Sequence, residues 1–197
     1  MKLIETDLIL MVAADSVSDD VVQKWTVSGL VASAAARRKG GLHLTSDLLS
    51  ILGECGWVVQ ANAVNSRKPM DLSTSIGSDA PGCSELRGFL DLIAGEIPDA
   101  GSSLLSSWLN NASIQAGTMV ICIGAILASR DLILADLRWL DLPVPQWRWL
   151  AAVEGRITNV QLALNNDVYS RVQTALTEKA KPLMGTVKVF STGATTA

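Results

Sequence analysis

Apolar residues are most concentrated between Met119 and Leu142, and the first half of this run is almost uninterrupted. The second half carries five charged residues: Arg130, Asp131, Asp136, Arg138 and Asp141. Each of them would cost about 3 kcal/mol near the centre of a bilayer, so the pattern disfavours a helix that permanently spans a membrane. The run instead predicts two buried strands, Met119–Ala128 and Leu132–Leu140, joined by a turn.

The second of these runs fits two structures. A strand would place four apolar residues on one face, with Asp136 and Arg138 on the other. Those four residues are Ile133, Ala135, Leu137 and Trp139. A helix would instead align Ile133, Leu137 and Leu140. We predict the strand, while residues 132–142 remain open between the two structures.

The N-terminal region predicts a strand followed by a long helix. Leu8–Ala13 is continuously apolar, which implies a strand buried on both faces. Ser18 is the expected N-cap of the helix, and Arg37-Arg38-Lys39 lie at its C-terminal end, where they complement the helix dipole. The helix also contains small residues, which allow another element to approach closely. They are Ser28, Gly29, Ala32, Ser33, Ala34, Ala35 and Ala36.

Periodicity and turn signals predict the remaining elements. They are, in order, a helix over Ser46–Leu52, a strand over Trp57–Val64, a long loop over Asn65–Cys83, two amphipathic helices over Ser84–Ile93 and Ser102–Ala112, a strand over Arg156–Leu164, a helix over Asp167–Lys179 and a strand over Thr186–Phe190. The two amphipathic helices would form a helical hairpin.

These elements predict an α+β protein. Residues 1–190 would form a single domain, in which amphipathic helices and the helical hairpin cover a mostly antiparallel central sheet. Residues 191–197 would form a flexible C-terminal tail. A chain of 197 residues can bury a large core without a disulfide or a metal.

The composition shows an apolar surplus. Hydrophobic residues make up 49% of the chain and charged residues 18%, and the mean hydropathy is +0.32. This surplus indicates either an unusually large core or an apolar surface that meets a membrane, another subunit or another protein. The net charge of −3, with Arg37-Arg38-Lys39 as the only basic cluster, disfavours nucleic acid as a partner.

The first residues and the cysteines bear on the cellular compartment. Glu5 and Asp7 stand where a classical signal peptide would have a basic region followed by an apolar one. We therefore expect synthesis in the cytoplasm, followed by release and association with target membranes if the protein is membrane-active. Cys55, Cys83 and Cys122 form no CxxC pair, and the apolar run around Cys122 favours a buried thiol in a reducing compartment.

The sequence offers little support for catalysis. The single histidine, His43, follows two glycines, and this context is typical of a loop or cap residue rather than a member of a catalytic triad. Metal-ligand spacings and glycine-rich phosphate motifs are absent. Helix caps and solvated faces account for neighbouring carboxylates such as Asp136 and Asp141, although a cofactorless enzyme that uses carboxylates remains a third alternative. We predict no catalytic, cofactor-binding or metal-binding residue.

Four residues are candidates for contact with a membrane or a protein partner: Trp108, Trp147, Arg148 and Trp149. Trp147 and Trp149 flank Arg148 in a stretch that could anchor at a lipid headgroup interface, because tryptophan is amphipathic and arginine can extend beside it to water. The alternative is a strand whose tryptophans pack inward and whose arginine meets solvent.

The order of the predicted elements resembles that of the Cyt-type cytolytic delta-endotoxins and related single-domain cytolysins, in which helical hairpins cover a central sheet. The resemblance extends from Leu8–Ala13 through the hairpin Glu85–Ala112 to the strands after Met119. It implies a soluble protein without a catalytic site, which meets lipid, moves its helical layer away and oligomerises, and it carries over no functional residue. The alternative is a self-associating structural or partner-binding protein without membrane activity, which buries its apolar surplus in an interface.

Overall fold

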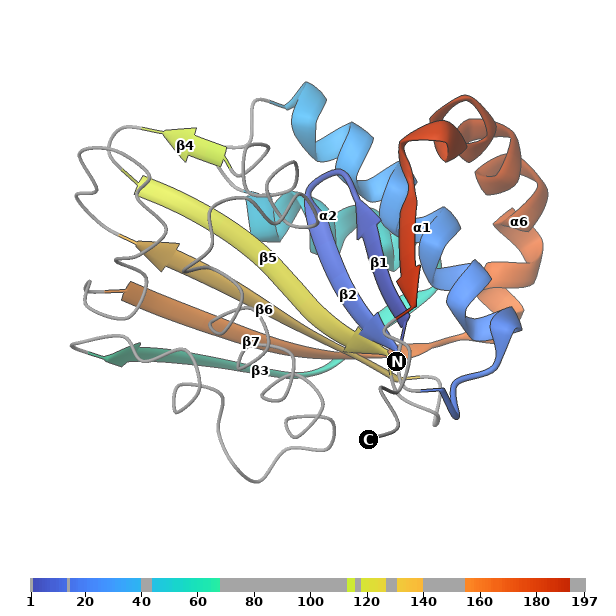
Figure 1. The fold of residues 1–197 in the computed structure, drawn as a ribbon. Coiled ribbons are helices and arrows are strands. Elements are labelled where there is room, and N and C mark those ends of the chain that lie inside the picture. The colour runs from blue at the N-terminus through green and yellow to red at the C-terminus, as the bar shows by residue number, and fades with distance from the viewer. Residues whose placement is uncertain are drawn as a thin grey trace, which may run out of the picture.

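The strands form one sheet in which the spatial order differs from the order along the chain (Figure 1). The computed structural model describes residues 2–13, 15–39, 44–67, 113–115, 118–126, 131–139 and 155–191. The strands in this part of the chain are β1 Lys2–Thr6, β2 Ile9–Ala13, β3 Trp57–Arg67, β4 Ser113–Gln115, β5 Thr118–Ile126, β6 Asp131–Trp139, β7 Gly155–Leu164 and β8 Lys188–Ser191. Their order across the sheet is β3-β7-β6-β5-β2-β1-β8, and β4 pairs with the start of β5 outside this path.

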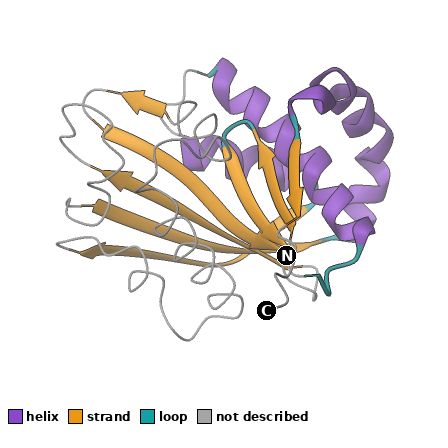
Figure 2. Cartoon of the chain, in the orientation of Figure 1, coloured by secondary structure: helices purple, strands orange, loops and turns teal. Residues whose placement is uncertain are grey.

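The helices of the described part of the chain gather beside the short strands β1, β2 and β8, at the right of the view in Figure 2. They are α1 Asp19–Arg38, α2 Leu44–Glu54 and α6 Asn166–Ala180, and a short 3-10 helix, η2 Lys181–Thr186, directly follows α6. α1 packs against β1, β2, α2 and α6, and α2 also packs against β3. α1 is therefore the central helix of this layer.

The described part of the core lies mainly between α1 and the sheet. Met11 of β2 and Trp25 of α1 belong to one cluster of buried side chains on this side. Leu10 and Val12 alternate with Met11 along β2 and are buried as well, each with 1% of its surface exposed. The expectation from the sequence that this strand is buried on both faces is therefore confirmed.

The structure confirms an α+β protein and most of the predicted elements that fall within the described residues. The two apolar runs form β5 and β6. The segment from Asp131 to Trp139 is therefore a strand, and its alternative interpretation as a helix is wrong. Six of the seven described strand pairings are antiparallel, and only β2 and β5 pair in parallel. The predicted helical hairpin Ser84–Ala112 lies outside the described residues.

Four details differ from the predictions. β1 was not predicted at all, because Lys2 and Glu5 interrupt its apolar pattern. Ser18 occupies the N-cap position of α1 but forms no side-chain capping hydrogen bond. The long loop cannot begin at Asn65, because β3 continues to Arg67, and the rest of that predicted loop lies outside the described residues. η2 takes the first position of the predicted last strand, and β8 extends to Ser191, one residue into the predicted tail.

The elements divide the molecule into two halves. The helix-clad half comprises β1, β2, β8, α1, α2, α6 and η2, and the long-strand half comprises β3 to β7. Along the described elements, the chain passes from one half to the other at Gly56, between α2 and β3, and at Asn165, between β7 and α6. The Asn165 amide donates a hydrogen bond of 2.8 Å to the Gly56 carbonyl, so the two crossings lie side by side. Among the described strands, the sheet joins the halves only where β2 pairs with β5.

Candidate functional site

The candidate contact residues from the sequence do not define a site in the structure. Trp108, Trp147, Arg148 and Trp149 all lie outside the described residues, as does His43. Within the residues that are described, no group of three or more His, Cys, Asp or Glu side chains could hold a metal ion. Over the same residues, no helix is both long enough and apolar enough to cross a membrane.

Three of the five charged residues in the apolar run have described backbone positions, all on β6. Asp131 begins this strand, and Asp136 and Arg138 occupy alternate positions further along it. Arg130 and Asp141 lie outside the described residues. The charges therefore occur within a paired strand rather than a helix, as the preferred interpretation of the sequence expected.

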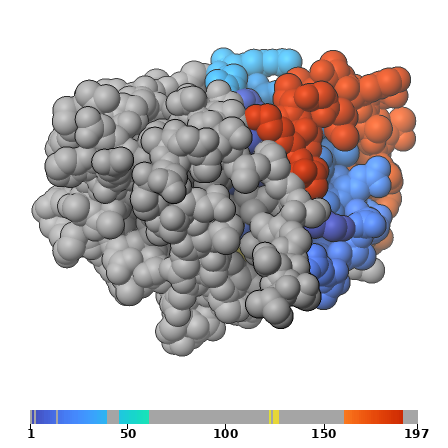
Figure 3. All heavy atoms as spheres, viewed as in Figure 1, coloured from blue at the N-terminus to red at the C-terminus, as the bar shows by residue number. Residues whose placement is uncertain are grey.

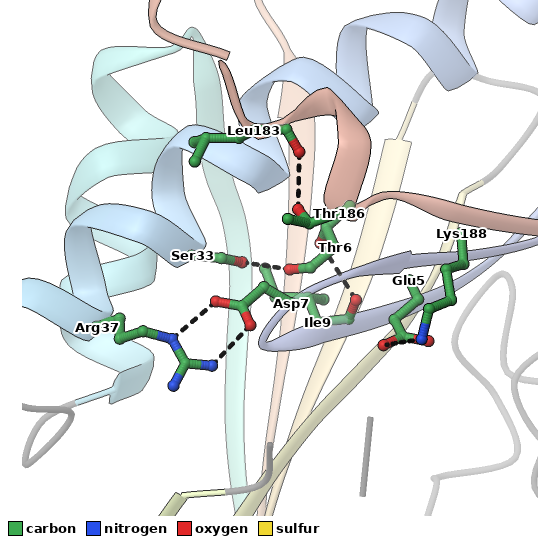
Figure 4. A network of polar contacts seen from close by, with 9 residues as sticks. All are labelled: Glu5, Thr6, Asp7, Ile9, Ser33, Arg37, Leu183, Thr186 and Lys188. Atoms are coloured by element: carbon green, nitrogen blue, oxygen red, sulfur yellow. Dashed lines mark hydrogen bonds and ion pairs between the residues drawn. The ribbon is translucent and has the colours of Figure 1, made fainter. Parts of the chain in front are cut away.

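The part of the structure with the most specific polar contacts is the junction between α1 and the β1–β2 hairpin (Figure 4). The Ser33 hydroxyl donates a hydrogen bond of 2.8 Å to the Thr6 carbonyl, and the Thr6 hydroxyl donates one of 3.2 Å to the Ile9 carbonyl. Ser33 and Thr6 are fully buried. These bonds satisfy polar groups that would otherwise be costly to remove from water, so they fix α1 against the hairpin.

Asp7 and Arg37 close the same junction at the surface. Arg37 donates from Nε and Nη2 to the two carboxylate oxygens of Asp7, at 2.8 and 2.6 Å. This two-point contact suits the planar guanidinium, and the hydrogen bonds that Arg37 donates to Asp7 raise the pKa of Arg37. Asp7 has a φ of 60°, a left-handed conformation that aspartate tolerates better than most residues and that suits the tight turn between β1 and β2.

The other end of α1 is also tied to β1. Lys2 Nζ lies 2.6 Å from a carboxylate oxygen of Asp19, the first residue of α1. The hydrogen bond and charge of Lys2 lower the pKa of Asp19. Because Lys2 is the first residue of β1 and Asp7 directly follows its last residue, the two ion pairs hold α1 to this strand at both ends. We call them the hairpin clamps.

Small and aromatic side chains fill the space between the clamps. Ser28, Gly29 and Ser33 of the predicted small-residue stripe are buried, which confirms the tight internal packing expected of them. A Cβ atom on Gly29 would lie 3.0 Å from the ring of Trp25 and 3.3 Å from the Thr6 hydroxyl, so a larger residue would press on both neighbours. The ring of Trp25 in turn meets Trp57 edge to face, with the ring centroids 6.0 Å apart.

Cys55 lies in the helix-clad half, at the end of α2, and has 1% of its surface exposed. Burial raises its pKa to about 11, and a hydrogen bond with Ser28 offsets only part of that effect. The thiol is therefore protonated at neutral pH, which makes it a poor nucleophile. Cys122 of β5 is also buried, as the sequence predicted, and it pairs with Ile9 of β2 where the two halves meet.

The site that emerges is therefore a junction between parts of the protein rather than an arrangement of catalytic groups. Small residues and the terminal charges of α1 were visible in the sequence, but their partners on β1 were not, because β1 itself was not predicted. Comparison with protein-family models, with curated proteins and with solved structures finds no match to this chain.

Proposed function

We propose that this protein is a non-enzymatic, membrane-active protein of the cytolysin type, which binds lipid and oligomerises after its helical layer separates from the long strands. The observation that supports this proposal is the arrangement of the two halves. β3, β7, β6 and β5 are consecutive in the sheet and have 9 to 11 residues each. A tilted strand needs about 9–11 residues to cross the hydrocarbon core of a bilayer.

The line along which the halves would separate is the pairing of β2 with β5. This pairing covers five residue pairs, from Ile9↔Cys122 to Ala13↔Ile126, and it is parallel. Parallel pairing is slightly less stable per residue than antiparallel pairing. The hairpin clamps hold α1 to β1, so α1 and the β1–β2 hairpin would move together. The adjacent crossings at Gly56 and Asn165 would serve as the pivot.

Accessibility of the two buried thiols tests this movement. In a Cys83→Ser background, a maleimide should label Cys122 slowly in buffer and at least tenfold faster after addition of vesicles, because separation of β2 exposes it. Cys55 is the matched control, since it lies within the helix-clad half and should stay protected. Labelling of both thiols would indicate general unfolding, and labelling of neither during vesicle leakage would contradict the proposed separation.

A reversible disulfide between β2 and β5 tests whether the two halves must separate before the protein can permeabilise vesicles. Ile9→Cys would place a thiol beside Cys122 on the neighbouring strand, and paired positions of adjacent strands lie within the distance range that a disulfide spans. The oxidised variant should release no dye from vesicles, and reduction should restore release. Ile9→Ser, which cannot crosslink, is the control for the altered core. Equal leakage by the oxidised and reduced forms would exclude separation at this pairing.

A second candidate function is self-association without membrane activity. It is favoured by the exposed valines at the two edges of the sheet, Val58 and Val59 on β3 and Val189 on β8, which are 45 to 56% exposed. Edge strands with exposed apolar side chains can pair with another chain. Size-exclusion chromatography distinguishes the two candidates. A fixed oligomer in plain buffer, with no lipid association, would favour this alternative.

A further inference from the structure

The register of the long strands places two arginines directly opposite each other. Arg138 of β6 pairs with Arg156 of β7, at the ends of these strands that lie at the left of the view, away from α1 and α6 (Figure 1). Directly opposite residues of antiparallel strands share one face of the sheet, and their Cβ atoms lie about 5 Å apart. The two positively charged residues are therefore cross-strand neighbours on one face.

The same face of the sheet is apolar closer to the helices. Alternate residues of a strand share a face, and this face continues to Leu134 and Leu132 on β6 and to Val160 and Leu162 on β7. Val160 and Leu162 are buried in the core cluster that also contains Trp25 of α1. In the space-filling view, α1 and the C-terminal elements, coloured blue and red, form the right of the surface (Figure 3). The face that belongs to the core near the helices therefore carries charged residues at its far end.

One acidic residue accompanies the two arginines. Asp136 and Thr158 form the next pair on this face, so Asp136 is two residues from Arg138 along β6 and diagonal to Arg156. Among the residues that β3, β5, β6 and β7 place in these two rows, Asp136 is the one acid. Like charges directly opposite each other destabilise a sheet. Because one carboxylate offsets only one of the two positive charges, the two rows retain a net positive charge.

Hydroxyl residues flank the arginines in the same row. Arg156 pairs with Ser66 of β3. Arg138 pairs with Val120 of β5, which in turn pairs with Ser113 of β4. Guanidinium and hydroxyl groups both donate hydrogen bonds, and arginine suits anions with several oxygens in one plane or fork. The row therefore combines positive charge with hydrogen-bond donors, which is the chemistry that recognises an oxyanion.

We propose that Arg138 and Arg156 form a binding site for a phosphate monoester, with Ser66 and Ser113 as further donors at its two sides. A phosphate between the arginines replaces their mutual repulsion with two attractions. It also offers three acceptor oxygens, enough for both arginines and a serine, whereas a carboxylate offers two. Soluble phosphomonoesters and lipid headgroups both carry this group. The site does not depend on the proposed membrane activity.

Calorimetric titration of the full chain with inorganic phosphate tests this site. Arg138→Gln and Arg156→Gln should each weaken phosphate binding about 10- to 100-fold, as expected for the loss of a hydrogen bond between charged groups. Arg67→Gln is the matched control. Arg67 pairs with Gly155 in the adjacent row, so it lies on the opposite face at the same end of the sheet, and binding should stay within about twofold of the wild type. Absence of phosphate binding by the wild type, or an equal loss in all three variants, would overturn the proposal.

Thermal unfolding in phosphate-free buffer gives a second measurement. Arg138→Gln removes one of two like charges, so its melting temperature in that buffer should equal or exceed that of the wild type. Phosphate should then raise the melting temperature of the wild type and leave that of the variant nearly unchanged at the same concentration. If the variant melts lower in phosphate-free buffer and the wild type does not respond to phosphate, a carboxylate of the chain already neutralises the arginines and the proposal is wrong.

Vesicle co-sedimentation identifies the source of the phosphate group. The vesicles contain phosphatidylcholine alone or phosphatidylcholine mixed with phosphatidic acid. Binding to the mixed vesicles that Arg138→Gln weakens and inorganic phosphate displaces would support the site with a lipid headgroup as its ligand. Phosphate binding without vesicle binding would support it with a soluble phosphomonoester. The second result, together with the absence of vesicle leakage, would contradict the proposed membrane activity while leaving this site in place.

Discussion

The two halves of this molecule reach their structure by different means. In the helix-clad half the strands have only four or five residues, and buried side chains, hydrogen bonds and the hairpin clamps join them to the helices. In the long-strand half β5, β6, β7 and β3 pair over eight to ten residues at each step. Side-chain contacts with helices therefore hold the first half together, whereas long backbone ladders hold the second.

The largest expected effect comes from removing the aromatic contact between the halves. Trp25→Ala should lower the free energy of unfolding by about 3–5 kcal/mol, because a fully buried indole leaves a cavity. Urea denaturation followed by circular dichroism measures this change. Val58→Ala, at an exposed edge position, should change it by less than about 0.5 kcal/mol. A loss below about 1 kcal/mol for Trp25→Ala would contradict the core described above.

Gly56→Ala probes the pivot and should cost about 2 kcal/mol. Gly56 has a φ of 95°, which alanine adopts only with strain, and a Cβ atom there would lie 3.0 Å from the backbone oxygen of Asn165 and from the backbone nitrogen of Tyr169. Thermal unfolding measures the loss of stability. Unchanged stability would show that the two crossings are not tightly packed against each other.

Two glycines in helices allow a closely packed position to be compared with one that has free space around it. Gly29→Ala should destabilise the protein by about 1 kcal/mol, because the new methyl group would meet the ring of Trp25 and the Thr6 hydroxyl. Gly53→Ala meets no atom within 4 Å and should stabilise α2 by about 0.5–1 kcal/mol, since alanine favours the helix. Chemical denaturation of both variants should give changes of opposite sign.

The ion pair between Asp7 and Arg37 should contribute less to the stability of the fold than the buried contacts do. Half of the Arg37 side chain is exposed, so solvent screens the pair, and its coupling should be about 0.5–1 kcal/mol. A double-mutant cycle with Asp7→Asn and Arg37→Gln measures this value, and asparagine also tolerates the left-handed conformation of residue 7. A coupling near zero would leave only the buried hydrogen bonds to hold that end of α1.

The smallest effect concerns the pH dependence of the other clamp. Lys2 lowers the pKa of the exposed Asp19, so the pair contributes to stability above the ordinary pKa of an aspartate, and that contribution is lost as the pH falls through the lowered value. Lys2→Ala should therefore raise the pKa of Asp19, as followed by NMR titration. An unchanged pKa would mean that Lys2 does not hold Asp19 in solution.

Local signals predicted much of this structure because several of them agreed along short stretches. Ser18 before α1 and Arg37-Arg38-Lys39 at its end defined that helix almost to the residue. The helix predicted over Asp167–Lys179 begins one residue earlier as α6, where the Asn165 side chain accepts hydrogen bonds from the amides of Asp167 and Val168. The apolar runs of β5 and β6 were read correctly as strands.

Contacts between residues that are distant in the sequence could not be predicted. Polar and apolar residues do not alternate clearly along β1, because Glu5 is buried beside Lys188 of β8. No local sequence pattern predicts this contact. The parallel pairing of β2 with β5 joins strands from distant parts of the chain. The contacts between α1 and the β1–β2 hairpin also join residues distant in the sequence, so the sequence showed the individual side chains without showing that they meet.

The position of β1 between β2 and β8 also has a consequence for synthesis on the ribosome. β1 finds one neighbour at once, since β2 follows after a tight turn, but its other neighbour, β8, is the last of the described strands to be made. β2 likewise waits for β5, which follows it only after α1, α2, β3 and β4. A nascent chain can therefore form the hairpin and α1 early, but the β2 side of that hairpin stays unpaired until β5 is made, and the β1 side until β8 is made. During that interval the hairpin would be a binding site for molecular chaperones.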